Sequence, residues 1–142
     1  MYARGGGGVS EAIIEREWTT GAGLRAIALI IVFENVKTGE RYKNHRCGYV
    51  ESPPALVGKD YDNINVRVHG GLTYAAPNNP GVVEDKSGSY WFGFDCAHAG
   101  DGDIERPSYL PGPSRGEAKT LEFVVAECES LAAQLVQLGA RP

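Results

Sequence analysis

Hydrophobic residues recur with two different periods along this chain of 142 residues, and the two periods separate strands from one helix. Residues 24–33 are apolar on both faces, which is typical of a strand in the centre of a sheet. A turn signal at residues 35–40 then predicts a hairpin. Residues 41–51 form the returning strand, whose alternation places His45 and Cys47 on the same face.

Further strands are predicted on both sides of this hairpin. Residues 64–68 alternate and predict a half-buried strand, which resumes at residues 72–74 after two glycines. Residues 90–96 predict the last strand. Residues 11–18 fit a strand or a capped helix equally well, so both alternatives stay open.

The clearest helical periodicity lies in residues 117–138. Seven apolar residues form one stripe there: Leu121, Val124, Val125, Cys128, Leu131, Leu135 and Leu138. Such a stripe must be buried on another element. The sequence therefore predicts an α+β fold, an antiparallel sheet of four to five strands with a long C-terminal helix packed on one face. We expect one domain over residues 11–142, preceded by a flexible glycine-rich segment at residues 1–10.

Composition narrows the classes of function. The net charge of −4 argues against an extended nucleic-acid surface, which needs clustered Lys and Arg. The longest apolar run, residues 26–33, is too short to span a bilayer, and residues 1–10 lack the apolar part of a signal peptide. Three cysteines without a secretion signal predict reduced thiols. We expect a soluble cytoplasmic protein, and homo-oligomerisation stays open.

Reactive side chains are densest in one stretch, YWFGFDCAHAGD, which runs from an aromatic strand into Asp95, Cys96, His98 and Asp101. A strand end aims side chains from a rigid element, and a carboxylate beside an imidazole raises its basicity. His98, Asp95 and Asp101 are therefore candidate catalytic residues, with His69 as a fourth. The alternative is that both aspartates bond to loop amides and Cys96 is a buried small hydrophobe.

A second stretch, HGGLTY, is the predicted partner of the first. Gly70 and Gly71 follow His69, so backbone amides there can approach a ligand closely. Tyr74 and Trp91 complete the candidate ligand-binding set, because an exposed ring can stack on a base. Packing roles for the rings, and a structural role for His69, are the competing interpretations.

Two mirror-image pairs, His45-x-Cys47 and Cys96-x-His98, suggest a zinc site. If their strands are adjacent, two cysteines and two histidines could hold Zn²⁺ tetrahedrally. The spacing is shorter than that of common zinc motifs, so four unrelated residues are the alternative. Nucleophilic catalysis by Cys96 or Cys47 with His98 would need a lowered thiol pKa, for which the sequence offers no helix N-terminus.

The chain resembles a family of small bacteriophage and prophage proteins that share HRCGYV, GKDYD, VHGGLTY, WFGFDCAHAGD and a helix such as FVVAECESLAAQL. These segments fall at residues 45–50, 58–62, 68–74, 91–101 and 123–135. The chain departs from the family in its Gly-rich N-terminus and in shorter loops near Ala55 and Ile104. The resemblance carries no assigned reaction, cofactor or catalytic residue. It implies a phage accessory protein in the cytoplasm of a bacterial host, with a role against host defence.

The residues and the resemblance together support three hypotheses of function. In the first, HGGLTY and DCAHAGD build a pocket that binds a small polar, nucleotide-like ligand. In the second, the protein is a small hydrolase that uses His98 or Asp95 as a general base, with or without a metal ion. In the third, it is an inhibitor that binds a host protein, and the motifs are structural.

Overall fold

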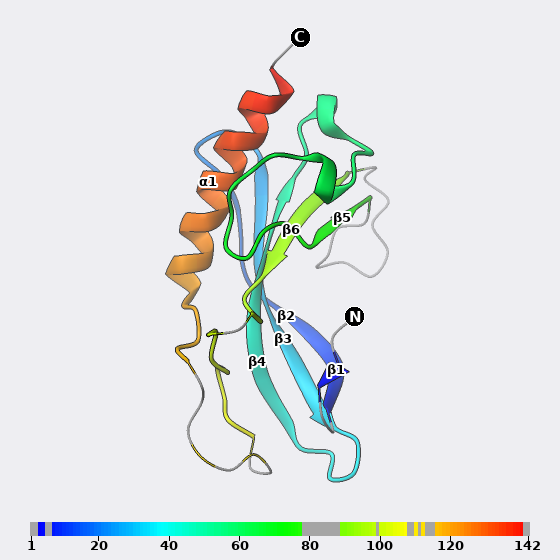
Figure 1. Cartoon of the computed structure of the whole chain (residues 1–142), viewed down its shortest axis with the longest axis vertical. Helices are drawn as coiled ribbons and strands as arrows, with labels where there is room; N and C mark the ends of the chain where they lie inside the picture. Colours follow the sequence, from blue (N-terminus) through cyan, green and yellow to red (C-terminus); the bar gives the residue numbers. More distant parts are fainter. Residues whose placement is uncertain are drawn as a thin grey trace.

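Six strands form one antiparallel sheet with the order β1-β2-β3-β4-β6-β5 in the computed structural model of the chain (Figure 1). The structure describes residues 3–4, 7–77, 89–98, 100–107, 110, 112 and 116–140. β1 has only two residues, so five longer strands and one C-terminal helix make up the fold. The predicted α+β class is therefore confirmed.

The centre of the sheet is the hairpin of β3 (Arg25–Asn35) and β4 (Arg41–Glu51), as the hydrophobic pattern predicts. β3 is buried on both faces along most of its length. Asn35 closes the turn, because its Oδ1 accepts a hydrogen bond from the backbone N–H of Lys37 at 2.9 Å. Gly39 has φ of 74°, a left-handed conformation that glycine adopts without strain.

The ambiguous residues 11–18 lie in a strand, β2 (Gly7–Thr19), which pairs with β3 over its whole length with two register shifts. Without β2, that side of β3 would present an unpaired row of backbone groups. β1 (Ala3–Arg4) pairs with the start of β2. The segment predicted to be flexible, residues 1–10, thus contributes β1 and the first residues of β2, while residues 1, 2, 5 and 6 lie outside the described part of the chain.

The other edge consists of β6 (Trp91–Asp95), which pairs with β4, and β5 (Tyr74–Ala76), which pairs with β6. The strand predicted at residues 64–68 is not formed. The backbone N–H of Arg67 donates to Gln134 Oε1 at 2.7 Å, and Gln134 Nε2 donates to the backbone carbonyl of Arg67 at 2.8 Å. A helix side chain thus satisfies backbone groups that a strand neighbour would have paired.

Helix α1 (Leu121–Gly139) lies across one face of the sheet (Figure 1). It begins four residues later than predicted, because Thr120 is its N-cap and accepts a hydrogen bond from the N–H of Phe123 at 3.1 Å. Four residues of the predicted stripe are buried, Val124, Cys128, Leu131 and Leu135, and Ala132 is buried beside them. The other stripe residues, Leu121, Val125 and Leu138, are partly buried. Within the described residues, no helix has both the length and the hydrophobicity needed to cross a bilayer.

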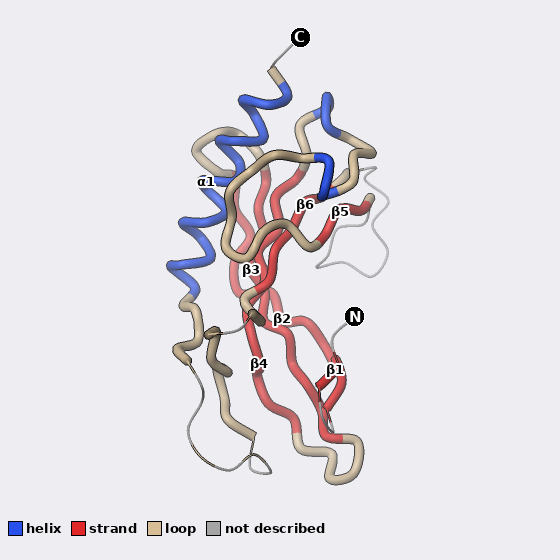
Figure 2. Tube along the Cα trace, viewed as in Figure 1, coloured by secondary structure: helices blue, strands red, loops and turns tan. Residues whose placement is uncertain are grey.

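The sheet, drawn as red strands in Figure 2, separates two hydrophobic cores. The helix-side core packs α1 against alternate residues of the strands, among them Ala26, Ala28, Val50, Phe92, Phe94 and Cys96. The far core lies on the opposite face and contains Ile27, Leu29, Ile31, Phe33, Tyr42, Cys47, Tyr49 and Trp91. Because successive side chains alternate, neighbours in one strand belong to different cores.

Candidate functional site

The candidate site forms where β6 ends at Asp95 and the chain leaves the sheet. The N–H of Ala97 donates to Asp95 Oδ1 at 3.0 Å. The next turn is closed twice, because the N–H of His98 donates to Asp101 Oδ2 at 3.1 Å and the N–H of Asp101 donates to the carbonyl of His98 at 2.9 Å. Gly100 permits this turn with φ of 93°. His98 and Asp101 are thus locked side by side.

The second stretch, HGGLTY, approaches from the loop before β5. The backbone N–H of His69 donates to Glu127 Oε1 on α1 at 2.7 Å. Gly70 lies against the imidazole of His98, since a Cβ built on this glycine would be 2.1 Å from the His98 ring. Only a residue without a side chain allows this contact, which brings the loop of His69 up to His98.

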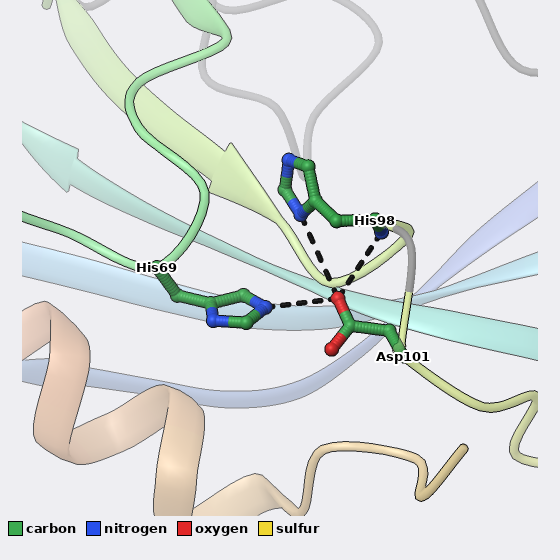
Figure 3. Close-up of side chains that lie close together, drawn as sticks. All are labelled: His69, His98 and Asp101. Atoms are coloured by element: carbon green, nitrogen blue, oxygen red, sulfur yellow. Dashed lines mark hydrogen bonds and ion pairs between the residues drawn. The ribbon is translucent and has the colours of Figure 1, made fainter.

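Two imidazoles converge on one carboxylate oxygen in this site (Figure 3). His69 Nε2 lies 2.8 Å from Asp101 Oδ2, and His98 Nδ1 lies 3.6 Å from the same oxygen. The other ring nitrogen of His98, Nε2, lies 3.7 Å from Asp95 Oδ1. The two rings meet edge to face, with centroids 5.4 Å apart. The structure therefore brings together all four residues predicted to be catalytic.

The side chain of Asp101 is only 3% exposed, yet it is stabilised as a carboxylate. Its loss of water acts to raise its pKa. The hydrogen bonds from His69 and from the His98 N–H, and then the charges of His69 and Lys119, outweigh that effect and lower the pKa of Asp101 below its ordinary value. An ionised Asp101 holds the proton of His69 on Nε2, and Nδ1 makes no hydrogen bond to the described residues.

Lys119, Phe123 and Glu127 also belong to the site, and the sequence did not single them out. Lys119 Nζ lies 3.6 Å from Asp101 Oδ1, and the Phe123 ring packs edge-on against His69 with centroids 5.2 Å apart. Helical spacing places Phe123 and Glu127 one turn apart on one side of α1, which is the one local signal that could have paired them. Nothing local links Lys119 to Asp101, 18 residues earlier.

The predicted ligand-binding residues do not stay together. Tyr74 packs on Tyr49 at 5.1 Å beside the far core, and Trp91 is 0% exposed within that core. The N–H of Gly71 donates to a carbonyl in its own turn at 2.9 Å, so it is not available to a ligand. Only Gly70 touches the cluster. Strand alternation directs Tyr74 and Trp91 to the face opposite α1.

The predicted zinc set of His45, Cys47, Cys96 and His98 is not assembled. Cys47 lies in the far core and Cys96 in the helix-side core. The reason is register: Cys47 pairs with Asp95, so the residue after Asp95 points to the opposite face. His45 is buried beside the far core, and only His98 reaches the cluster.

The thiols are poorly suited to nucleophilic catalysis. Cys47, Cys96 and Cys128 are all buried, and none of them forms a disulfide. Burial, followed by the nearby charges of Asp101, Cys47 and Asp95, raises the pKa of Cys96 to about 12. Burial also raises the pKa of Cys128. A protonated, enclosed thiol is a weak nucleophile, so the structure does not support Cys96 as one.

Two hollows formed by described residues lie elsewhere. The larger, of about 240 Å³, is next to the start of β3 and is bordered by Trp18, Arg25 and Trp91. Arg25 stacks over the Trp91 ring there, 5.2 Å from its centroid. Neither hollow has a histidine or cysteine in its lining. The candidate site is identified by its converging side chains.

Comparison with known proteins does not extend this picture: no family model, no curated protein and no solved structure matches the chain. The chemistry of the cluster is therefore the main guide to function.

Proposed function

We propose that the protein binds a small polar, nucleotide-like ligand at the cluster of His69, His98 and Asp101. The observation that carries the proposal is the Asp101 carboxylate, 3% exposed and bonded from two separate loops. Both imidazoles beside it are partly exposed, at 23% for His69 and 33% for His98. A buried carboxylate that is hydrogen-bonded to a solvent-accessible imidazole is characteristic of functional sites, because the carboxylate orients the imidazole and fixes its tautomer.

Hydrolysis is the second candidate function, and the 2.8 Å contact between His69 and Asp101 favours it. In this role Asp101 fixes the tautomer, and Nδ1 of His69 takes a proton from water or from a ligand hydroxyl. The base is then His69. His98 is less suited, because its Nδ1 is enclosed and lies next to Asp101.

The resemblance to small phage proteins supports a role as an accessory protein in an infected bacterial cell. A nucleotide signal of host defence is a ligand of suitable chemistry, because it combines polar groups with a ring that can lie over an imidazole. Sequestering or destroying such a signal would both use this site. An inhibitor that binds a host protein would not need it.

Native mass spectrometry of tag-free protein tests the proposal. We expect a small-molecule adduct on the wild-type protein, and its loss in His69→Ala at an unchanged melting temperature. The matched control is Arg67→Ala, two residues away, which removes an exposed side chain and should keep the adduct. A ligand recovered intact after denaturation indicates binding, and a cleaved product indicates hydrolysis.

Two results would count against a ligand site. One is a wild-type protein without an adduct that is also not stabilised by any member of a nucleotide panel in thermal unfolding. The other is an adduct that His69→Ala retains in full. Either would favour the protein-binding hypothesis, in which the cluster is structural.

A further inference from the structure

We infer that His69, His98 and Asp101 form a binding site for one divalent transition-metal ion of the class that prefers imidazole and carboxylate ligands, such as Zn²⁺. Each residue offers one ligand atom, and the three atoms lie within 4.8 Å of one another. The site shares only His98 with the set predicted from the sequence. The inference goes beyond the proposed function, because an ion can bind here without a second ligand.

Two of the three distances between ligand atoms in the cluster are close to those of a tetrahedral site. Ligand atoms about 2.0–2.2 Å from a zinc ion are separated from one another by roughly 3.3–3.5 Å. His98 Nδ1 and Asp101 Oδ2, at 3.6 Å, are already near that separation. His69 Nε2 and Asp101 Oδ2 are at hydrogen-bond distance, 2.8 Å. That pair would open by about half an ångström when the ion replaces the shared proton.

The two ring nitrogens of His98 are arranged as in a metal-bound histidine. Nδ1 is enclosed and has no hydrogen-bond partner among the described residues, although it faces Asp101. An enclosed polar atom without a partner is unfavourable, and a metal ion at this position would satisfy it. The opposite nitrogen, Nε2, lies 3.7 Å from Asp95 Oδ1. Metal-binding histidines commonly direct their second N–H at a carboxylate in this way.

Asp95 is itself held in place for this role. Its Oδ1 accepts a hydrogen bond from the N–H of Ala97 at 3.0 Å, and its Oδ2 accepts one from the Thr73 hydroxyl at 3.2 Å. Thr73 belongs to the HGGLTY stretch, so the same two loops that supply the ligands also fix the carboxylate behind them.

The charges around the cluster favour a cation. Asp95, Asp101 and Glu127 contribute three carboxylates, and Lys119 contributes one ammonium group. Three carboxylates against one ammonium group leave an excess of negative charge, which attracts a divalent ion. Lys119 lies next to Oδ1 of Asp101, which leaves Oδ2 for the ion. A bound ion would reverse the local sign, and its open coordination position would accept an anionic ligand.

Titration of the chelator-treated, tag-free protein with Zn²⁺ alone, followed by calorimetry, tests the inference. We expect one equivalent to bind, and His69→Ala and His98→Ala to weaken binding by about tenfold or more each. Lys119→Met removes a repelling charge and should tighten binding several-fold, an effect that a merely structural cluster would not show. Arg67→Ala is the matched control and should bind as the wild type does.

Cobalt provides a second measurement. Co²⁺ at the same site should give visible absorption bands, and Zn²⁺ should displace it. Substoichiometric Zn²⁺ binding by the wild-type protein, or wild-type affinity in both alanine variants, would overturn the inference. If the alanine variants unfold, Asp101→Asn replaces them, because it keeps the shape and the hydrogen-bonding oxygen while losing the charged ligand.

The two proposals fail separately. Zn²⁺ is titrated with no other ligand present, and the mass-spectrometric adduct can be sought in chelator. If Zn²⁺ binds and no adduct is found, the metal site is supported and the ligand proposal is refuted. If an adduct survives chelation and Zn²⁺ does not bind, the ligand proposal is supported and the metal site is refuted.

Discussion

The pairs His45-x-Cys47 and Cys96-x-His98 have the same spacing, but their histidines lie in different environments. His45 and Cys47 lie within β4, and both are buried on the face away from α1. Cys96 follows the last residue of β6 and is buried on the helix side, while His98, two residues later, is one-third exposed. Identical spacing therefore gives two packed side chains in β4, and after β6 it gives one packed thiol and one imidazole that reaches His69 and Asp101.

The difference lies in whether the strand continues. Inside β4, alternation sends His45 towards the ring of Phe33, and its Nδ1 lies 2.8 Å from Asn44 Oδ1. After β6, the turn from His98 to Asp101 redirects both side chains towards HGGLTY. A strand interior uses a histidine for packing, and a strand end makes it available to chemistry.

The largest contrast should appear in thiol reactivity. Cys96 neighbours the site but is 2% exposed, and burial with nearby negative charges raises its pKa to about 12. At neutral pH its thiolate fraction is about 1000-fold below that of a free cysteine, so native alkylation by iodoacetamide should be slower by at least that factor. Peptide mass spectrometry measures it, with urea-unfolded protein as the control. Fast native labelling of Cys96 would show that the thiol is part of the chemistry.

Stability should separate the two histidines next. His45→Ala removes an enclosed ring from beside the far core and should lower the free energy of unfolding by about 2–4 kcal/mol. His98→Ala, at a partly exposed loop position, should lower it by less than about 1 kcal/mol. Urea unfolding measures both. If His98→Ala proves the more destabilising variant, the cluster is structural and the contrast is lost.

Much of the fold could be predicted because it depends on local periodicity. The β3–β4 hairpin and α1 each carry a clear pattern of apolar residues, and burial follows from it. Residues 64–68 carry a pattern as well, but their alternation reflects packing beside α1, where Gln134 supplies the hydrogen bonds. Periodicity predicts which side chains are buried, and it does not say what pairs with the backbone.

The site could be predicted in part. Asp95, His98, Asp101 and His69 stood out because reactive side chains beside glycines mark a strand end. The pairing register of β4 and β6 decides whether Cys47 and Cys96 point to the same face of the sheet. Spacing within each strand does not reveal this register, so the separation of the two cysteines could not be derived from the sequence. Lys119 reaches Asp101 through tertiary folding. That contact has no sequence signal.

Two adjacent glycines in HGGLTY allow the role of His98 in the cluster to be tested separately from strain in its neighbouring loop. Gly70 and Gly71 both have positive φ, 69° and 82°, so alanine strains the backbone at either position. Only at Gly70 would the added Cβ meet the His98 ring, at 2.1 Å, while Gly71 has open space. We therefore expect Gly70→Ala to weaken Zn²⁺ binding by about 10- to 100-fold and Gly71→Ala to leave it near the wild-type value.

Calorimetry of these two glycine variants, alongside their melting temperatures, separates strain from displacement of the ring. Similar melting temperatures with different Zn²⁺ affinities would show that Gly70 acts through His98. Equal losses of affinity in both variants would mean that strain in the loop, and not the contact with His98, disturbs the cluster.

The smallest effect should come from Asp95, which faces His98 but does not reach the inferred ion. Asp95→Asn keeps the side chain's shape and the oxygen that accepts from the Ala97 N–H, while it removes the charge beside Nε2 of His98. Its NH2 group replaces the oxygen that accepts from the Thr73 hydroxyl, and it can donate to the oxygen of that hydroxyl instead. We expect Zn²⁺ affinity to fall by about tenfold with little change in stability. Asp62→Asn, at an exposed turn, is the charge-matched control. An equal loss in that control would attribute the effect to net charge, and Asp95 would then have no specific part in orienting His98.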